Sequence, residues 1–167
     1  CGNADTLTLT VESPMYIQAG LDLTACEHSG DLVLEVEDFE STFLWSAVSE
    51  EGAEALVSSE TGVVDVSVLT TGTFTYVVTG GEGTCQTNDS VNIHVLPLPE
   101  INMPMDELYC VNAGEVVLNP PSPLGGAWSG MGISNPVAGL FMPDLAGVGN
   151  HTLSYAYTDL STGCAAT

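Results

Sequence analysis

The feature that most constrains this chain is a frame of cysteine and tryptophan residues that occurs twice. In each occurrence an opening cysteine is followed, at nearly the same spacing, by a tryptophan and then by a closing cysteine. The two sets are Cys26, Trp45 and Cys85, and Cys110, Trp128 and Cys164. Repetition at this period is the signature of arrays built from similar modules. We therefore expect tandem domains that share one fold.

A second repeated pattern surrounds the closing cysteines. Residues 1–11, CGNADTLTLTV, are echoed by residues 85–95, CQTNDSVNIHV. Both segments end in alternating polar and apolar residues, which is typical of a strand with one buried face. Cys1 takes the place of a closing cysteine. Residues 1–12 are therefore predicted to form the last strand of a preceding repeat.

Short alternating segments rich in β-branched residues, separated by Gly, Pro and Asn, occur along the whole chain, and none shows the period of a helix. Strands are expected at residues 7–11, 32–36, 43–46, 63–69, 73–79, 91–95, 116–118, 127–129 and 152–158. This spacing predicts an all-β fold of tandem immunoglobulin-like β-sandwich domains. Prolines after the two closing strands place one repeat at 13–97 and another at 98–167, which lacks its last strand.

Aromatic residues fall at core positions of this expected fold. Trp45 and Trp128 lie on the third strand, where an immunoglobulin-like sandwich keeps its core aromatic ring. Tyr76, Tyr155 and Tyr157 alternate along the penultimate strand. We expect their rings to be buried and their hydroxyl groups to reach backbone acceptors.

Charge excludes several classes of partner. The chain has 22 Asp and Glu residues, no Lys or Arg, and a formal net charge of -22. It cannot neutralise phosphates, so it binds no nucleic acid by counterion release. Anionic membranes repel it, and no apolar run is long enough for direct membrane insertion.

Calcium is the one cofactor that the composition makes plausible, because this ion prefers carboxylate oxygens. Acidic residues gather where the expected repeats join, namely Glu12, Asp22, Glu100, Asp106 and Glu107. Calcium held there would stiffen the array. No EF-hand loop is present, and in the alternative reading the acidic residues simply keep the surface solvated.

Five cysteines in small β-rich units predict an oxidising, extracellular setting. One assignment forms a bridge within each unit, Cys26 with Cys85 and Cys110 with Cys164, and leaves Cys1 for a partner elsewhere. In immunoglobulin topology these partners lie at opposite ends of a strand of roughly 17–20 Å, whereas a disulfide needs Cα atoms within about 7 Å. The alternative joins neighbouring units through Cys26 and Cys164. The sequence leaves both pairings open.

The second unit resembles a known class of repeat. The matching motifs are GGAWSGMGI at 125–133, GLFMP at 139–143, AGVG at 146–149, YAYTD at 155–159 and the final Gly163-Cys164. They resemble the Ig-like or PKD-like repeats of giant secreted Bacteroidota cell-surface proteins of the gliding-adhesin and extracellular-filament type. In the first unit the likeness is confined to Cys26, Trp45, residues 73–76 and Cys85. The resemblance implies type IX secretion, a place on the cell surface and no catalytic residues.

Two further features, a pair of Asp-Ser/Thr motifs and an apolar group, can each be explained either by a function or by the fold alone. Asp5-Thr6-Leu7 and Asp89-Ser90-Val91 resemble O-glycosylation sites of the same bacteria, although an Asp that caps a turn explains them equally well. Thr6 and Ser90 are thus candidate glycan acceptors. An apolar group could form a lateral contact between chains or simply fill the end of a sandwich. Its members are Leu124, Met131, Ile133, Val137, Leu140 and Met142.

The leading hypothesis is structural. The chain is expected to be a segment of a long extracellular repeat protein that forms a filament, stalk or spacer on the bacterial surface. Its partners are neighbouring repeats of the same chain and other copies in a homo-oligomeric fibre. The alternative is an adhesin module that binds glycan or another cell through exposed loops at 125–148. We expect no enzyme, since the histidines have no nucleophile at a motif spacing and no phosphate-binding loop is present.

Overall fold

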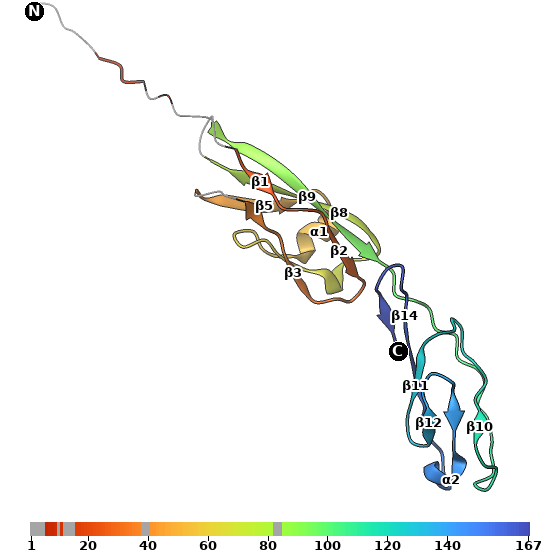
Figure 1. Cartoon of the computed structure of the whole chain (residues 1–167). Coiled ribbons are helices and arrows are strands. Elements are labelled where there is room, and N and C mark those ends of the chain that lie inside the picture. Colours follow the sequence, from red (N-terminus) through yellow and green to blue (C-terminus); the bar gives the residue numbers. More distant parts are fainter. Residues whose placement is uncertain (1–5, 10, 12–15, 38–40, 82–84) are drawn as a thin grey trace, which may run out of the picture. The chain divides into compact units, whose positions relative to one another are not determined.

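The computed structural model describes residues 6–9, 11, 16–37, 41–81 and 85–167 (Figure 1). The all-β prediction is confirmed: antiparallel strands dominate, and only 9% of the described residues are helical. The chain divides into two units, Cys1–Val95 and Leu96–Thr167. That division lies beside the boundary expected at Pro97, whereas the boundary expected at Ser13 falls outside the described residues.

The first unit contains one four-stranded sheet in the order β2-β9-β8-β5, one three-stranded sheet in the order β3-β7-β6, and the pair β1-β4. Its strands are β1 Gln18–Ala19, β2 Leu23–Cys26, β3 Asp31–Val33, β4 Val36–Glu37, β5 Phe43–Ala47, β6 Leu56–Ser58, β7 Val63–Asp65, β8 Gly72–Gly80 and β9 Thr87–Leu96. A short helix, α1 (Glu50–Ala55), follows β5, and a 3-10 turn, η1 (Val66–Val68), follows β7.

Strand β9 shows how the sequence builds this unit. Val91, Ile93 and Val95 alternate with polar residues and are only 2%, 0% and 3% exposed. Side chains along a strand point to opposite faces in turn, so one face of β9 enters the core while the other stays polar. β9 lies between β2 and β8 and pairs with the whole length of β8, from Gly72↔Val95 to Gly80↔Thr87. The closing strand is thus central to the sheet.

Three local predictions in this unit are wrong. The single strand expected at 32–36 is divided between β3 and β4, which belong to different sheets. The helix α1 was not expected; Ser49 caps it by accepting a hydrogen bond from the Gly52 N–H at 3.1 Å, and a single short turn leaves no helical period in the sequence. The strand expected at 63–69 ends at Asp65. There the Asp65 side chain accepts a hydrogen bond from the Ser67 N–H at 2.9 Å, which turns the backbone into η1.

The second unit has fewer and shorter strands. They are β10 Val116–Val117, β11 Ala127–Ser129, β12 Ile133–Asn135, β13 Leu140–Phe141, β14 Ser154–Thr158 and β15 Ala165–Ala166, with a short helix α2 at Pro143–Ala146. The sheets have the orders β10-β13-β12 and β11-β14-β15. The buried core residues are Leu118, Trp128, Phe141, Ala146 and Tyr155.

Trp45 is held in the first unit by a loop that ends in a glycine. Its ring is 2% exposed, and its backbone N–H donates to the carbonyl oxygen of Ser59 at 2.8 Å. Three residues further on, the carbonyl oxygen of Gly62 accepts a hydrogen bond from the Leu34 N–H at 2.9 Å. Gly62 has φ +66° and packs against the indole.

Trp128 has the same surroundings in the second unit. Its ring is 7% exposed, and its backbone N–H donates to the carbonyl oxygen of Pro136 at 3.0 Å. The carbonyl oxygen of Gly139, again three residues further on, accepts from the Leu118 N–H at 2.9 Å. Gly139 has φ +64° and also packs against the indole. Both tryptophans are therefore core residues, as the sequence predicted.

Two of the three tyrosines have the buried ring and the hydroxyl bond to the backbone that the sequence predicted. Tyr76 is fully buried and donates to the carbonyl oxygen of Gly52 at 3.1 Å. Tyr155 is 4% exposed and donates to the carbonyl oxygen of Pro123 at 2.9 Å. Tyr157 is half-buried beside the second core.

Candidate functional site

The cysteines are in two chemical states. Cys26, at the end of β2, and Cys164, just before β15, are disulfide-bonded. Cys85 and Cys110 are free thiols. The assignment of one bridge within each unit is therefore wrong, because it requires Cys85 and Cys110 to be oxidised. The alternative pairing of Cys26 with Cys164 fits these states, and Cys1 lies outside the described residues. A disulfide fits a non-reducing compartment.

In the described part of the chain no group of three or more His, Cys, Asp or Glu side chains is arranged to hold a metal ion, and calcium between repeats stays a prediction. Glu12 lies outside that part. Glu100 and Asp106 are exposed. Asp22 and Glu107 are instead engaged by neighbours within their own units, as follows.

Asp22 is bound across two strands of the first unit. Its carboxylate accepts hydrogen bonds from the Asn92 backbone N–H at 2.8 Å and from the Asn92 side-chain amide at 3.2 Å. The imidazole of His94 lies 3.8 Å away. Donation from the Asn92 backbone is the main reason that the pKa of Asp22 is lowered from 3.8, and His94 adds a smaller attraction. The carboxylate ties the start of β2 to β9.

The carboxylate of Glu107 also joins two segments through hydrogen bonds, in this case within the second unit. Its carboxylate accepts from the Tyr109 hydroxyl and from the Asn119 N–H at 3.1 Å. The bond from Tyr109 lowers the pKa of Glu107 and raises the pKa of Tyr109 to about 12. Glu107 therefore joins the segment before Cys110 to the segment after β10.

The remaining predicted site residues lie on the surface to different degrees. Thr6 and Ser90 are both exposed, and a glycan on either residue stays a prediction. In the apolar group, Met131 and Val137 are 64% and 79% exposed. Ile133, Leu140 and Met142 are half-buried, and Ile133 packs against the second core. Filling of the end of the β-sandwich thus accounts for the half-buried members of this group. A lateral contact between chains stays a prediction for Met131 and Val137.

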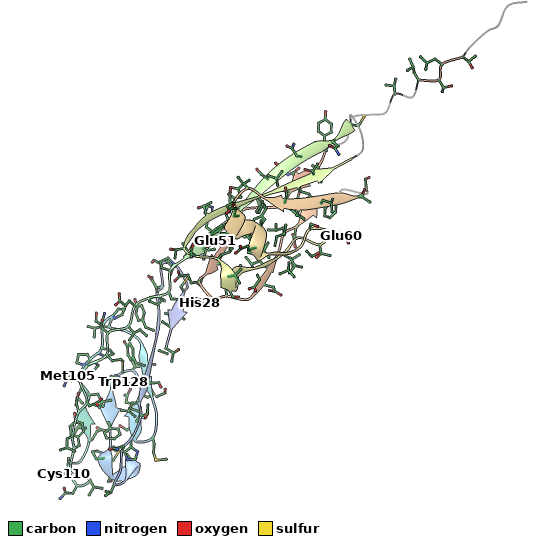
Figure 2. The ribbon with its side chains drawn as sticks, turned by 180° about the vertical axis from the view of Figure 1, so that it is seen from behind. His28, Glu51, Glu60, Met105, Cys110 and Trp128 are labelled. Atoms are coloured by element: carbon green, nitrogen blue, oxygen red, sulfur yellow. The ribbon has the colours of Figure 1, made fainter. Side chains whose placement is uncertain are left out.

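A groove of about 780 Å³ runs along the second unit and was not predicted. Residues of the segments 103–109 and 147–153, together with Val111, line it. Leu118, Trp128 and Phe141 reach it from the core, and Figure 2 labels Met105 and Trp128 in this region. Leu108 and Val148 on its walls are 97% and 92% exposed. Asp106, Glu107, Asn150 and His151 also line it, so the groove is a mixed polar and apolar surface that is open to solvent.

Strand β14 has an open edge in this unit. On one side β14 pairs with β11 from Ser154 to Ala156. On the other side it pairs with β15 only at Tyr157 and Thr158, so among the described residues the edge at Ser154–Ala156 has no partner strand.

Comparisons with known proteins give no family assignment: no protein-family model matches the sequence, and neither does any curated protein. Within the described residues no helix is long and apolar enough to cross a membrane.

Proposed function

We propose that this chain is a structural segment of a long extracellular repeat protein that forms a filament, stalk or spacer on a bacterial surface. One observation carries the proposal. Each unit surrounds its tryptophan in the same way, with a backbone bond from the Trp N–H and a positive-φ glycine three residues beyond the acceptor. Two such units in succession, on a cysteine frame that also repeats, are the pattern of a tandem array.

The chemistry of the surface supports a passive, load-bearing role. The chain carries a net charge of -22 and no basic residue, which keeps parallel chains apart and soluble unless a specific contact joins them. Strands β8 and β9 are paired over the full length of β8, and the disulfide at Cys26 and Cys164 limits extension of the backbone. The resemblance of residues 125–164 to Bacteroidota surface repeats points the same way.

Electron microscopy of the native protein, in calcium and in chelator, tests this function. Fibres that are several β-sandwiches wide, with a regular axial repeat, are expected. Globular particles without an axial repeat would contradict the proposal. Single beaded threads that end in a distinct domain would instead favour the adhesin stalk, and bending on chelation would identify calcium between repeats.

A further inference from the structure

Asp22 and His94 face each other across two neighbouring strands of the first unit. Asp22 comes directly before β2, and His94 lies on β9, the next strand in the sheet. The imidazole Nε2 of His94 is 3.8 Å from Oδ2 of Asp22, which is too long for a hydrogen bond. The side chain of His94 is 43% exposed and that of Asp22 is 51% exposed. Dissolved ions can therefore reach both atoms.

The other ring nitrogen of His94 already has a partner. Thr73 stands directly opposite His94 in the pairing of β8 with β9, and its hydroxyl oxygen lies 3.0 Å from Nδ1. When Nδ1 carries the ring proton, it donates to this hydroxyl, and Nε2 presents its lone pair toward Asp22. A neutral imidazole that donates from one nitrogen and leaves the other free is the form in which histidine binds a metal ion.

The carboxylate of Asp22 is held in place as well. It accepts hydrogen bonds from the backbone N–H of Asn92 at 2.8 Å and from the side-chain amide of Asn92 at 3.2 Å. That amide is itself oriented, because its oxygen accepts a hydrogen bond from the Thr75 hydroxyl at 2.8 Å. Both candidate ligands thus have hydrogen-bonded neighbours, and such neighbours orient the ligands of metal sites.

We propose that His94 Nε2 and Asp22 Oδ2 bind a divalent transition metal ion of the zinc class on the surface of the first unit. Zinc bonds to imidazole nitrogen at about 2.0–2.1 Å and to carboxylate oxygen at about 2.0–2.2 Å. Two such bonds span 3.8 Å, and a small rotation of either exposed side chain brings the angle at the ion toward tetrahedral. Water completes the coordination, since no third His, Cys, Asp or Glu among the described residues joins the pair.

The ligand types select the ion. Imidazole nitrogen suits zinc, copper and nickel, whereas calcium takes six to eight oxygen ligands. The calcium predicted between repeats is therefore a different ion with different ligands, although Asp22 is a candidate for both. The net charge of -22, with no Lys or Arg, adds a general attraction for cations. A bound ion would join the start of β2 to β9 and stabilise the first unit by mass action.

A zinc titration followed by NMR of the histidine rings tests the proposal. The chain has only three histidines, and the nitrogen shifts of their rings show which one binds. The free thiols are alkylated first, because thiolates also bind zinc. Zinc between about 1 μM and 1 mM, a range that covers ordinary affinities, should shift Nε2 of His94 before it affects His28 or His151. Calcium over the same range should leave the shift of His94 unchanged.

Variants separate the ligands from their neighbours. Loss of a neighbour that orients a ligand typically weakens metal binding by about 10–100-fold. Thr73→Val should have an effect of this size, and His94→Gln and Asp22→Asn should weaken binding further. The matched controls, which should bind zinc as the parent chain does, are Thr79→Val on the same strand, Asp31→Asn and His151→Gln.

Thermal unfolding gives a second measurement. Zinc should raise the unfolding temperature of the parent chain and leave that of His94→Gln unchanged. Tryptophan fluorescence of each metal-free variant shows whether it folds, and Thr73→Val, which removes no ligand, decides the question if Asp22→Asn does not.

Three results would overturn the proposal. They are a His94 ring whose shift does not change up to about 1 mM zinc, binding that His94→Gln leaves intact, and binding that a folded Asp22→Asn chain retains in full. None of these results bears on the axial repeat seen by microscopy, so the proposed function stands or fails separately.

Discussion

Gly62 lies so close to Trp45 that a Cβ atom built on it would stand 2.7 Å from the indole Nε1 and 2.9 Å from the carbonyl oxygen of Leu34. The indole nitrogen is buried, and it is the one such side-chain atom in the described residues without a hydrogen-bond partner. The glycine therefore allows a loop to cover the flat ring of Trp45 without a gap. Gly139 and Trp128 repeat the contact, with a separation of 3.1 Å for the same constructed atom.

Gly62→Ala is expected to destabilise the first unit by at least about 2 kcal/mol, since a side chain at positive φ costs roughly 1–3 kcal/mol and an overpacked core adds a similar amount. Chemical denaturation followed by tryptophan fluorescence measures the change. Gly30→Ala is the control, because nothing lies within 4 Å of a Cβ at that position. Equal stability of Gly62→Ala and Gly30→Ala would mean that the loop over Trp45 can shift to accommodate a side chain at little cost in free energy.

Tyr76→Phe is expected to lower stability at neutral pH by roughly 1–3 kcal/mol, because the carbonyl oxygen of Gly52 loses its donor in a buried site. Burial, with a further contribution from the charge of Glu51, raises the pKa of Tyr76 from 10.0 to about 12. A tyrosine with a raised pKa contributes stability below pH 10, and that contribution is lost as pH rises toward about 12.

The difference between the parent chain and Tyr76→Phe should therefore shrink between pH 10 and about 12. Urea unfolding at several alkaline pH values measures it. Tyr16→Phe removes a phenol that is 81% exposed and should give a constant difference from the parent. Parallel pH profiles for all three proteins would exclude Tyr76 as the group that loses stability in alkali.

The sequence predicted the parts of this fold that depend on local alternation and burial. The strands around Trp45 and Trp128 and the buried face of β9 follow from residues that are close in the sequence. Contacts between residues that are far apart in the sequence could not be predicted from local patterns. Asp22 bonds to Asn92, 70 positions away, so a carboxylate that suggested a calcium ligand is occupied by a neighbouring strand. The groove depends on the paths of two segments with no strand pattern of their own.

Asp22→Asn is expected to destabilise the first unit at neutral pH and to have little effect in strong acid. The Asn92 backbone N–H lowers the pKa of Asp22 from 3.8, with help from the Asn92 side chain and His94. A carboxylate with a lowered pKa contributes stability above its unfolded value, and the contribution is lost as pH falls through the folded value. The two proteins should therefore converge below pH 3.8.

Thermal unfolding between about pH 7 and about pH 2 measures this convergence. Asp31→Asn, an exposed carboxylate of the same unit, serves as the control and should not reproduce it. A stability gap between the parent chain and Asp22→Asn that persists unchanged into strong acid would show that the Asn92 contact does not depend on the charge of Asp22.

The cysteine states lead to a prediction that peptide mapping can decide. Because Cys26 and Cys164 are disulfide-bonded and Cys85 and Cys110 are free, alkylation without reduction should label only the latter pair among these four residues. The chain has no Lys or Arg, so trypsin does not cut it and cleavage after Glu is needed. Glu100 separates the two free thiols, and Glu115 separates Cys110 from Cys164.

Mass spectrometry should then find the Cys26 peptide linked to the Cys164 peptide. Cys26→Ser should release Cys164 for alkylation and lower stability by roughly 2–4 kcal/mol, whereas Cys85→Ser should change neither. A linked Cys26–Cys85 pair would restore the bridge within one unit. The distinction matters mechanically: a bridge between Cys26 and Cys164 shortens the length of backbone that a pulling force can extend across both units, whereas bridges within units protect each one separately.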